Sequence, residues 1–150
     1  MLFRRCAAQA AGGTTLLAAL LLAAGCGGGP ERHPVRGTVT LDGAPLPEAN
    51  VTFIAETEGG PWGIARTDAQ GNYTICAGED EGLPVGKYKV RVSTYQDGNP
   101  QPDPPIPSVP ERVPMEYNRH TTLTREVKPG ENVFPLELKS GGEIFQPPGQ

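Results

Sequence analysis

The sequence predicts an all-β protein, a sandwich of seven short antiparallel strands that follows an N-terminal export signal. Glycine and proline together account for 37 of the 150 residues, which is typical of a chain with many turns. No segment after residue 30 keeps a helical period of apolar residues. Several short segments instead alternate apolar and polar residues, as half-buried strands do, and turn residues separate them. This combination predicts a β-sandwich.

Residues 1–25 have the pattern of an export signal. Arg4 and Arg5 give a positive start, and no acidic residue occurs before Glu31. A run of apolar residues follows at 16–24. It is too short for a membrane span, because crossing the hydrocarbon layer takes about 20 residues. A short apolar run behind a basic start is typical of a cleaved secretory signal.

The end of this segment, Ala23-Ala24-Gly25-Cys26 with Leu22 before it, resembles the lipid-attachment motif of bacterial lipoproteins. Leu22 lies one position earlier than the usual leucine of that motif. The resemblance implies cleavage between Gly25 and Cys26, and acylation of Cys26 with a diacylglycerol and commonly a further chain such as palmitate. Two or three acyl chains hold a protein stably on a membrane. The location would be the cell membrane or the outer membrane. The alternative is an ordinary cleaved signal with a free thiol at Cys26.

The remaining residues, 26–150, have the size of one acidic domain. The signal contains two of the 13 basic residues and none of the 17 acidic ones, so the remainder has a formal charge of −6. An acidic domain is a poor candidate for binding nucleic acid. With Cys6 in the signal and Cys26 acylated, we expect no disulfide in the mature chain. Cys76 is then predicted to be a small strand residue, with a reactive nucleophile as the alternative.

Residues 26–34 form a short glycine- and proline-containing tether, and strands begin after it. The first strand alternates apolar or glycine with polar residues and ends at the turn pair Asp42-Gly43. The second places Val51 and Phe53 inward, and the fourth does the same with Tyr73 and Ile75. The first four strands are expected at 35–41, 49–55, 62–67 and 72–76.

The strand at 86–95 has the clearest alternation, because Tyr88, Val90 and Val92 are interleaved with charged or polar residues. It therefore predicts a sheet with one buried and one solvated face. The loop before it carries acidic residues at 79–81. A solvated tip and a calcium site are the two interpretations, and the spacing matches no recognised calcium loop.

The later part of the chain contains a proline-rich loop and two more strands. Seven prolines fall within 96–114, so this loop is expected to be extended or mobile, as a spacer or as a polyproline ligand for a partner. Residues 121–127 and 132–139 are predicted to form a closing hairpin. Pro135 lies on its outward phase, which predicts an edge strand. Residues 140–150 are expected to be a disordered tail.

Three segments resemble the carboxypeptidase regulatory-like domain. Residues 35–46 resemble its opening, residues 67–75 its central turn, and residues 83–90 its glycine–aromatic–strand element, in the same order and spacing. The resemblance implies a transthyretin-like (prealbumin-like), seven-stranded Greek-key sandwich over residues 35–139. Gly37 would lie where strands pack closely. The later segments are similar to small bacterial lipoproteins that carry one such domain.

The sequence predicts no catalytic residues, no metal site and no cofactor. Metallocarboxypeptidases need paired zinc ligands and a glutamate base, whereas the two histidines, His33 and His120, lack such spacing. Transthyretin-like hydrolases of hydroxyisourate end in Tyr-Arg-Gly-Ser, and this sequence ends in Gln-Pro-Pro-Gly-Gln. The expectation is therefore a protein that is not an enzyme.

Three functional hypotheses follow. The first is a lipid-anchored structural, adhesion or scaffold module whose partner is an envelope protein. The second is a carbohydrate- or peptide-binding module, with Trp62, Tyr95 and Tyr117 as candidate ligand contacts. Burial of these aromatic residues in the core is the alternative. The third hypothesis is an enzyme built around Cys76.

Overall fold

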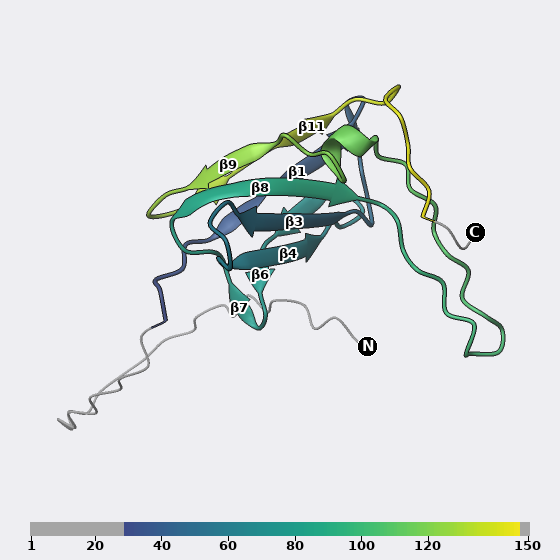
Figure 1. Ribbon diagram of the computed structural model, residues 1–150, viewed down its shortest axis with the longest axis horizontal. Helices are drawn as coiled ribbons and strands as arrows, with labels where there is room; N and C mark the ends of the chain where they lie inside the picture. The colour runs from purple at the N-terminus through teal and green to yellow at the C-terminus, as the bar shows by residue number, and fades with distance from the viewer. Residues whose placement is uncertain (1–28, 148–150) are drawn as a thin grey trace, which may run out of the picture.

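Two β-sheets pack face to face in the computed structural model, which describes residues 29–147 (Figure 1). The predicted β-sandwich is confirmed. In this part of the chain no helix is long and apolar enough to cross a membrane. The elements are β1 (Val35–Leu41), β2 (Ala44–Pro45), β3 (Asn50–Ala55), β4 (Trp62–Arg66), β5 (Asn72–Thr74), β6 (Cys76–Ala77), β7 (Asp80–Glu81), β8 (Gly86–Ser93), the 3₁₀ turn η1 (Met115–Tyr117), β9 (Thr124–Val127), β10 (Asn132–Val133) and β11 (Leu136–Leu138).

The first sheet is built around β1. This strand pairs antiparallel with β2 and β5, and parallel with β10 and β11. The prediction of a wholly antiparallel sandwich is thus wrong for the two last strands. Both β1 and β10 begin at the same end of the sandwich, with Val35 opposite Asn132. The turn between β1 and β2 is as predicted, because Asp42 and Gly43 both have positive φ, at 52° and 83°.

The second sheet is antiparallel throughout and has the order β7-β6-β4-β3-β8-β9. Its central strand, β3, pairs with β4 on one side and β8 on the other, so that Val51 lies opposite Ala65 and Val92. Because side chains alternate between faces, this register places Val51 and Val92 in the interior, and both are fully buried. The predicted inward faces of the second and fifth strands are confirmed.

The predicted strand at 72–76 divides between the two sheets. Its first part, β5, pairs with β1, whereas β6 pairs with β4. Ile75 lies between them, fully buried, and its amide donates to the Val35 carbonyl at 2.8 Å. The acidic residues at 79–81 do not form an open loop, because Asp80 and Glu81 pair with Ala77 and Cys76 as a short hairpin.

The predicted closing hairpin is wrong. Strand β9 pairs with β8 in the second sheet, whereas β10 and β11 pair with β1 in the first. The turn between β9 and β10 therefore crosses from one sheet to the other. The Asn132 side chain stabilises this crossing, accepting from the Lys128 amide at 2.9 Å and donating to the Lys128 carbonyl at 2.9 Å. Pro135 interrupts the outer strand, and its place at a sheet edge is confirmed.

Aromatic rings fill the space between the sheets. The Phe53 ring centroid lies 6.4 Å from that of Tyr73, 6.3 Å from that of Tyr88 and 6.1 Å from that of Phe134. The two tyrosine hydroxyls are satisfied, because Tyr73 donates to the Phe134 carbonyl at 2.8 Å and Tyr88 to the Pro84 carbonyl at 2.9 Å. The core therefore joins both sheets through Phe53.

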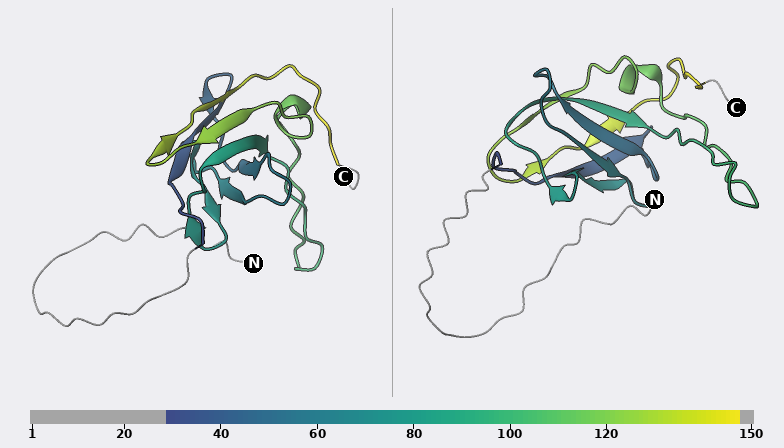
Figure 2. Two further views of the ribbon diagram at one scale, coloured as in Figure 1. Left: turned by 60° about the vertical axis from the view of Figure 1, so that its left-hand side comes forward. Right: turned by 60° about the horizontal axis from the view of Figure 1, so that its bottom comes forward.

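The sandwich has two distinct ends (Figures 1 and 2). At the tether end the chain enters β1, with the His33 amide donating to the Leu83 carbonyl and His33 Nδ1 accepting from the Gly130 amide. At the other end, here the arm end, β8 finishes at Ser93 and the chain leaves the sheet. The length of β8 separates the two ends.

The proline-rich loop folds back on itself instead of running freely. Gln96 and Val109 exchange backbone hydrogen bonds at 3.1 and 2.9 Å, and Asn99 and Ile106 do so at 2.8 and 2.9 Å. Residues 96–109 thus form an irregular hairpin, the proline arm, which projects from the arm end (Figure 2). The proline content of this loop does not predict the backbone hydrogen bonds between its two limbs.

The described part of the tail also differs from its prediction. Instead of extending as a disordered segment, it packs along the chain that follows the proline arm. The Met115 amide donates to the Glu143 carbonyl at 2.7 Å. Gln146 accepts from the Glu111 amide at 2.9 Å and donates to the Glu111 carbonyl at 2.8 Å. Paired side-chain and backbone bonds hold the tail in place.

Candidate functional site

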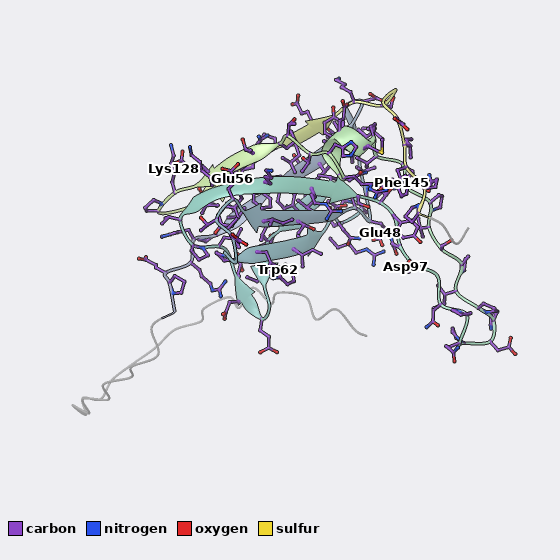
Figure 3. The ribbon with its side chains drawn as sticks, in the orientation of Figure 1. Glu48, Glu56, Trp62, Asp97, Lys128 and Phe145 are labelled. Atoms are coloured by element: carbon purple, nitrogen blue, oxygen red, sulfur yellow. The ribbon has the colours of Figure 1, made fainter. Side chains whose placement is uncertain are left out.

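A surface pocket with a volume of about 310 Å³ lies at the arm end, on the outward side of β8. Its size is at the lower limit of small-ligand sites. Four segments build it: the end of β8, Tyr95 in the following loop, the segment at 111–119 that contains η1, and the tail. The labelled Phe145 marks this end, opposite Lys128 at the tether end (Figure 3). The lining residues used below are Arg91, Ser93, Tyr95, Glu111, Asn118, Arg119, Phe145 and Pro147.

Glu111 lines the pocket and is only 6% exposed. Its Oε1 accepts from the Thr94 amide (2.9 Å), the Thr94 hydroxyl (2.9 Å), the Arg112 amide (3.0 Å) and the Val113 amide (3.0 Å). Its Oε2 accepts from the Ser93 hydroxyl at 2.5 Å. Hydrogen bonds rather than a cation thus compensate this buried charge. The carboxylate ties the segment at 111–113 to the end of β8.

The pKa of Glu111 is lowered from its ordinary value of 4.5. Burial acts in the opposite direction, since it disfavours the charged form. Hydrogen bonds from Ser93, Thr94 and Val113 outweigh burial. Glu111 is therefore ionised at neutral pH, and its lowered basicity makes it a weak general base for the adjacent Ser93 hydroxyl. Glu111 and Ser93 therefore have a structural role, here called the brace: they hold the segment at 111–113 against the end of β8.

Two further polar side chains of the pocket, those of Ser93 and Asn118, form hydrogen bonds with other groups of the protein. The Ser93 hydroxyl donates to Glu111 and accepts from the Tyr95 amide at 3.2 Å. Asn118, which is 4% exposed, donates to the Val113 carbonyl at 3.0 Å and accepts from the Arg119 amide at 2.5 Å. Both groups hold the pocket wall together.

Two arginines from separate elements line the same pocket. Arg91 projects from the outward face of β8, between the buried Val90 and Val92. Arg119 follows η1, and its guanidinium carbon lies 3.9 Å from the centroid of the Phe145 ring. This stacking fixes the Arg119 head group while leaving the N–H groups at its edge available.

The three aromatic residues predicted as ligand contacts are not brought together. Trp62 is 58% exposed on β4, opposite Ile54 and close to the tether end. Tyr95 lines the pocket at the arm end, where its hydroxyl donates to Asp97 at 2.9 Å. Tyr117 is partly buried against the core, and its hydroxyl accepts from the Lys139 amide at 3.3 Å. A shared aromatic platform is therefore absent from the described part of the chain.

Cys76 lies in the short strand β6, as expected of a small strand residue, and in the full-length chain it is disulfide-bonded. The expectation of no disulfide refers to the mature chain, without residues 1–25 and with Cys26 acylated, and it stays a prediction. A sulfur in a disulfide holds no thiolate, so this state offers no nucleophile for the enzyme hypothesis. Gly25 and Cys26, predicted to mark the cleavage and lipid-attachment site, also lie outside the described residues.

The histidines and the acidic hairpin do not converge on a site. His33 is 7% exposed and serves the turn at Gly130, and His120 is exposed. Asp80 lies 3.6 Å from Arg32 in an exposed ion pair. Within residues 29–147 no three histidine, cysteine or carboxylate side chains gather in a way that could hold a metal ion.

Sequence reasoning missed the pocket. The alternation of β8 predicts an outward side chain at Arg91, but nothing in the local pattern links it to Arg119. Glu111 lies among prolines in a loop that carries no periodic signal. Its role depends on contacts with Thr94 and Gln146, which are distant in sequence.

With this geometry in hand, residues 34–100 match the family model of the carboxypeptidase regulatory-like domain. The match covers β1 through β8 and the start of the proline arm. Domains of this family are transthyretin-like β-sandwiches, in agreement with the two sheets described above. No curated protein matches the chain significantly.

One solved structure is similar over part of its length. A crystal structure of chlorocatechol 1,2-dioxygenase from Pseudomonas putida aligns over 72% of this chain at 15% sequence identity, with a TM-score of 0.31. The alignment spans 60% of the length of that enzyme's chain. A TM-score of this size supports no conclusion about fold or function.

Proposed function

We propose that this protein is an exported, lipid-anchored, non-catalytic β-sandwich with a structural, adhesion or scaffold role in the cell envelope. Its membrane contact would be the lipid on Cys26, and its partner an envelope protein. The basic start, the short apolar run and Ala23-Ala24-Gly25-Cys26 support the anchor. The separation of the two ends of the sandwich supports the presentation of a contact surface.

The distance between the tether end and the arm end of the sandwich is the main observation behind the proposal. The tether leads into β1 beside Leu83 and Gly130, whereas the proline arm starts beyond Ser93. The eight residues of β8 lie between these ends, which corresponds to about 26 Å at about 3.3 Å per residue. An anchor at Cys26 would attach one end of the sandwich to the membrane. The proline arm and the pocket would then face away from the attachment point.

The proline arm is suited to protein contact. Ile106 is 57% exposed and Val109 36% exposed, and a shallow hollow of about 370 Å³ lies between the two limbs of the arm. Exposed apolar residues on a projecting segment commonly mark an interaction site. Prolines also restrict the backbone, which lowers the entropy lost when such a segment binds.

The anchor is tested by the intact mass of the mature protein purified from membranes, beside a Cys26→Ala variant. We expect an acylated mass that starts at Cys26 and an unacylated product from the variant. An unacylated wild-type mass would refute the anchor and make this a free secreted domain.

The scaffold role is tested by a photo-reactive amino acid placed at position 106 in intact cells. Position 54 is the matched control, since Ile54 is also exposed but lies on the outer sheet face near the tether end. We expect a discrete adduct with an envelope protein from position 106 and none from position 54. No adduct from position 106 would contradict the role assigned to the arm.

Carbohydrate or peptide binding is the second candidate, and the 58% exposure of Trp62 supports it. Aromatic faces stack on the apolar faces of ligands. A glycan array compares the wild type with Trp62→Ala. A retained glycan that is lost in the variant would support this candidate, and an array without retained ligand would refute the carbohydrate version.

A further inference from the structure

We propose that the pocket at the arm end binds a small carboxylate ligand with an apolar body, such as the C-terminal residue of a peptide, through Arg91 and Arg119. This inference goes beyond the anchoring and scaffold role. It does not depend on acylation of Cys26 or on the proline arm. It is argued from the available N–H donors of Arg91 and Arg119 and from the charge and shape of the pocket.

The first observation is that both arginines keep hydrogen-bonding capacity. The ion pairs formed among residues 29–147 use Arg32, Arg36, Arg66 and Lys128. Neither the Arg91 nor the Arg119 guanidinium lies in such a pair. A guanidinium has five N–H donors in a fork that matches the two oxygens of a carboxylate. The pocket therefore presents donors from two sides.

The second observation is that the other polar groups are engaged. The Glu111 carboxylate accepts five hydrogen bonds from the protein. The Ser93 hydroxyl and the Asn118 amide group are each bonded to neighbouring protein groups. A ligand therefore meets donors above all, and the matching ligand group is an acceptor.

The net charge of the pocket indicates which kind of hydrogen-bond acceptor group on a ligand it binds best. Two guanidinium groups and one carboxylate leave one net positive charge, in a chain whose formal charge is −4. A carboxylate brings one negative charge and balances this excess. A phosphate dianion would bring a second charge into a site that already contains ionised Glu111, and like charges disfavour one another. The balance favours a carboxylate.

The shape of the pocket adds an apolar requirement. Tyr95, Phe145 and Pro147 line the same space as the two arginines. Ligand sites typically join apolar walls with a few polar groups that set the orientation. The volume of about 310 Å³ suits a ligand of the size of one acylated amino acid. A free C-terminal carboxylate beside an apolar side chain has this form.

Fluorine NMR of the full chain tests the proposal with N-acetyl-fluorophenylalanine as the probe. Its amide, N-acetyl-fluorophenylalaninamide, has the same body without the charge, and inorganic phosphate represents the other oxyanion. Arg91→Gln and Arg119→Gln remove one guanidinium each. Lys89→Gln is the matched control, because Lys89 lies two residues before Arg91 on the same face of β8 and outside the pocket. Urea unfolding midpoints show whether each variant remains folded.

We expect saturable broadening of the acid's resonance, with a dissociation constant of about 1 mM or lower. Either arginine variant should weaken binding at least about tenfold, which corresponds to about 1.4 kcal/mol. Lys89→Gln should change it less than about twofold, and added salt should weaken it. The proposal would be overturned if the acid showed no saturable binding, or if the amide bound as tightly as the acid. It would also be overturned if Lys89→Gln weakened binding as much as the arginine variants do, or if phosphate bound more tightly than the acid. The comparison of acid and amide uses the wild type alone, so it holds even if a variant unfolds.

Discussion

Replacement of Glu111 by alanine should lower the free energy of unfolding by about 3 kcal/mol. The carboxylate satisfies two amides that are shielded from water, those of Thr94 and Val113, whose residues are 1% and 0% exposed. A buried donor left without an acceptor costs about 1–3 kcal/mol, so the two together give about 2–6 kcal/mol. A water molecule in the vacated space would recover part of this loss. The expected value therefore lies in the lower half of that range.

The charge of Glu111 adds a pH dependence with a definite sign. Its pKa in the folded state lies below the ordinary value of 4.5, so the unfolded state binds more protons in this range. Its contribution to stability is complete above about pH 5 and is lost as the pH falls through 4.5 towards the folded pKa. Glu111→Gln should reduce this slope without abolishing it. Asp42 and Asp68 also have lowered pKa values, from hydrogen bonds with Ser140 and Asn72 respectively, and they remain in the variant.

Urea unfolding of the full chain measures both effects, with equal m-values as the condition for comparing midpoints. Glu116→Ala is the matched control. This exposed glutamate lies five residues further on, and its removal should change stability by less than about 0.5 kcal/mol. A loss below about 1 kcal/mol for Glu111→Ala, or an unchanged acid slope for Glu111→Gln, would refute the brace assigned to this carboxylate.

Two other substitutions test the core. Phe53→Ala should cost about 3–5 kcal/mol in urea unfolding, because this fully buried ring contacts three other aromatic rings; a loss under about 1 kcal/mol would contradict the assigned core. Gly37→Ala should cost about 2 kcal/mol or more, because its Cβ would lie 2.0 Å from the Phe134 carbonyl oxygen. Gly29→Ala, with no atom within 4 Å of the added Cβ, should be neutral, and equal losses at both glycines would refute the steric reason.

Local pattern predicted the strands well where one face is buried and the other solvated. In β8 the side chains of Tyr88, Val90 and Val92 are buried, as the alternation indicated. The close packing at Gly37 was also expected, and the Phe134 backbone supplies it. Alternation reports the burial of a face, however, and contains no information about which strand lies alongside. The assignment of β9 and β10 to different sheets therefore could not follow from their patterns.

The proline-rich loop and the tail show a second reason why the structure differs from what the sequence predicts. Composition predicts that such segments lack regular structure, which is true of both, but irregular backbone is not the same as mobile backbone. Gln146 holds the tail through two bonds to the backbone of Glu111, 35 residues away. Hydrogen bonds of this kind leave no periodic trace in the sequence. They depend on sheet formation to bring the two segments together.

The same dependence explains why the candidate pocket lies at the arm end. The geometry of the sandwich fixes where β8 ends, and each segment that builds the pocket follows a strand or contacts one at that point. Arg91 is placed by the pleat of β8, and Glu111 is held by the residues at its end. Arg119 is oriented by Phe145 of the tail. Removing the tail should therefore release Arg119 while leaving Arg91 in place, so the two guanidinium groups would no longer act on one ligand.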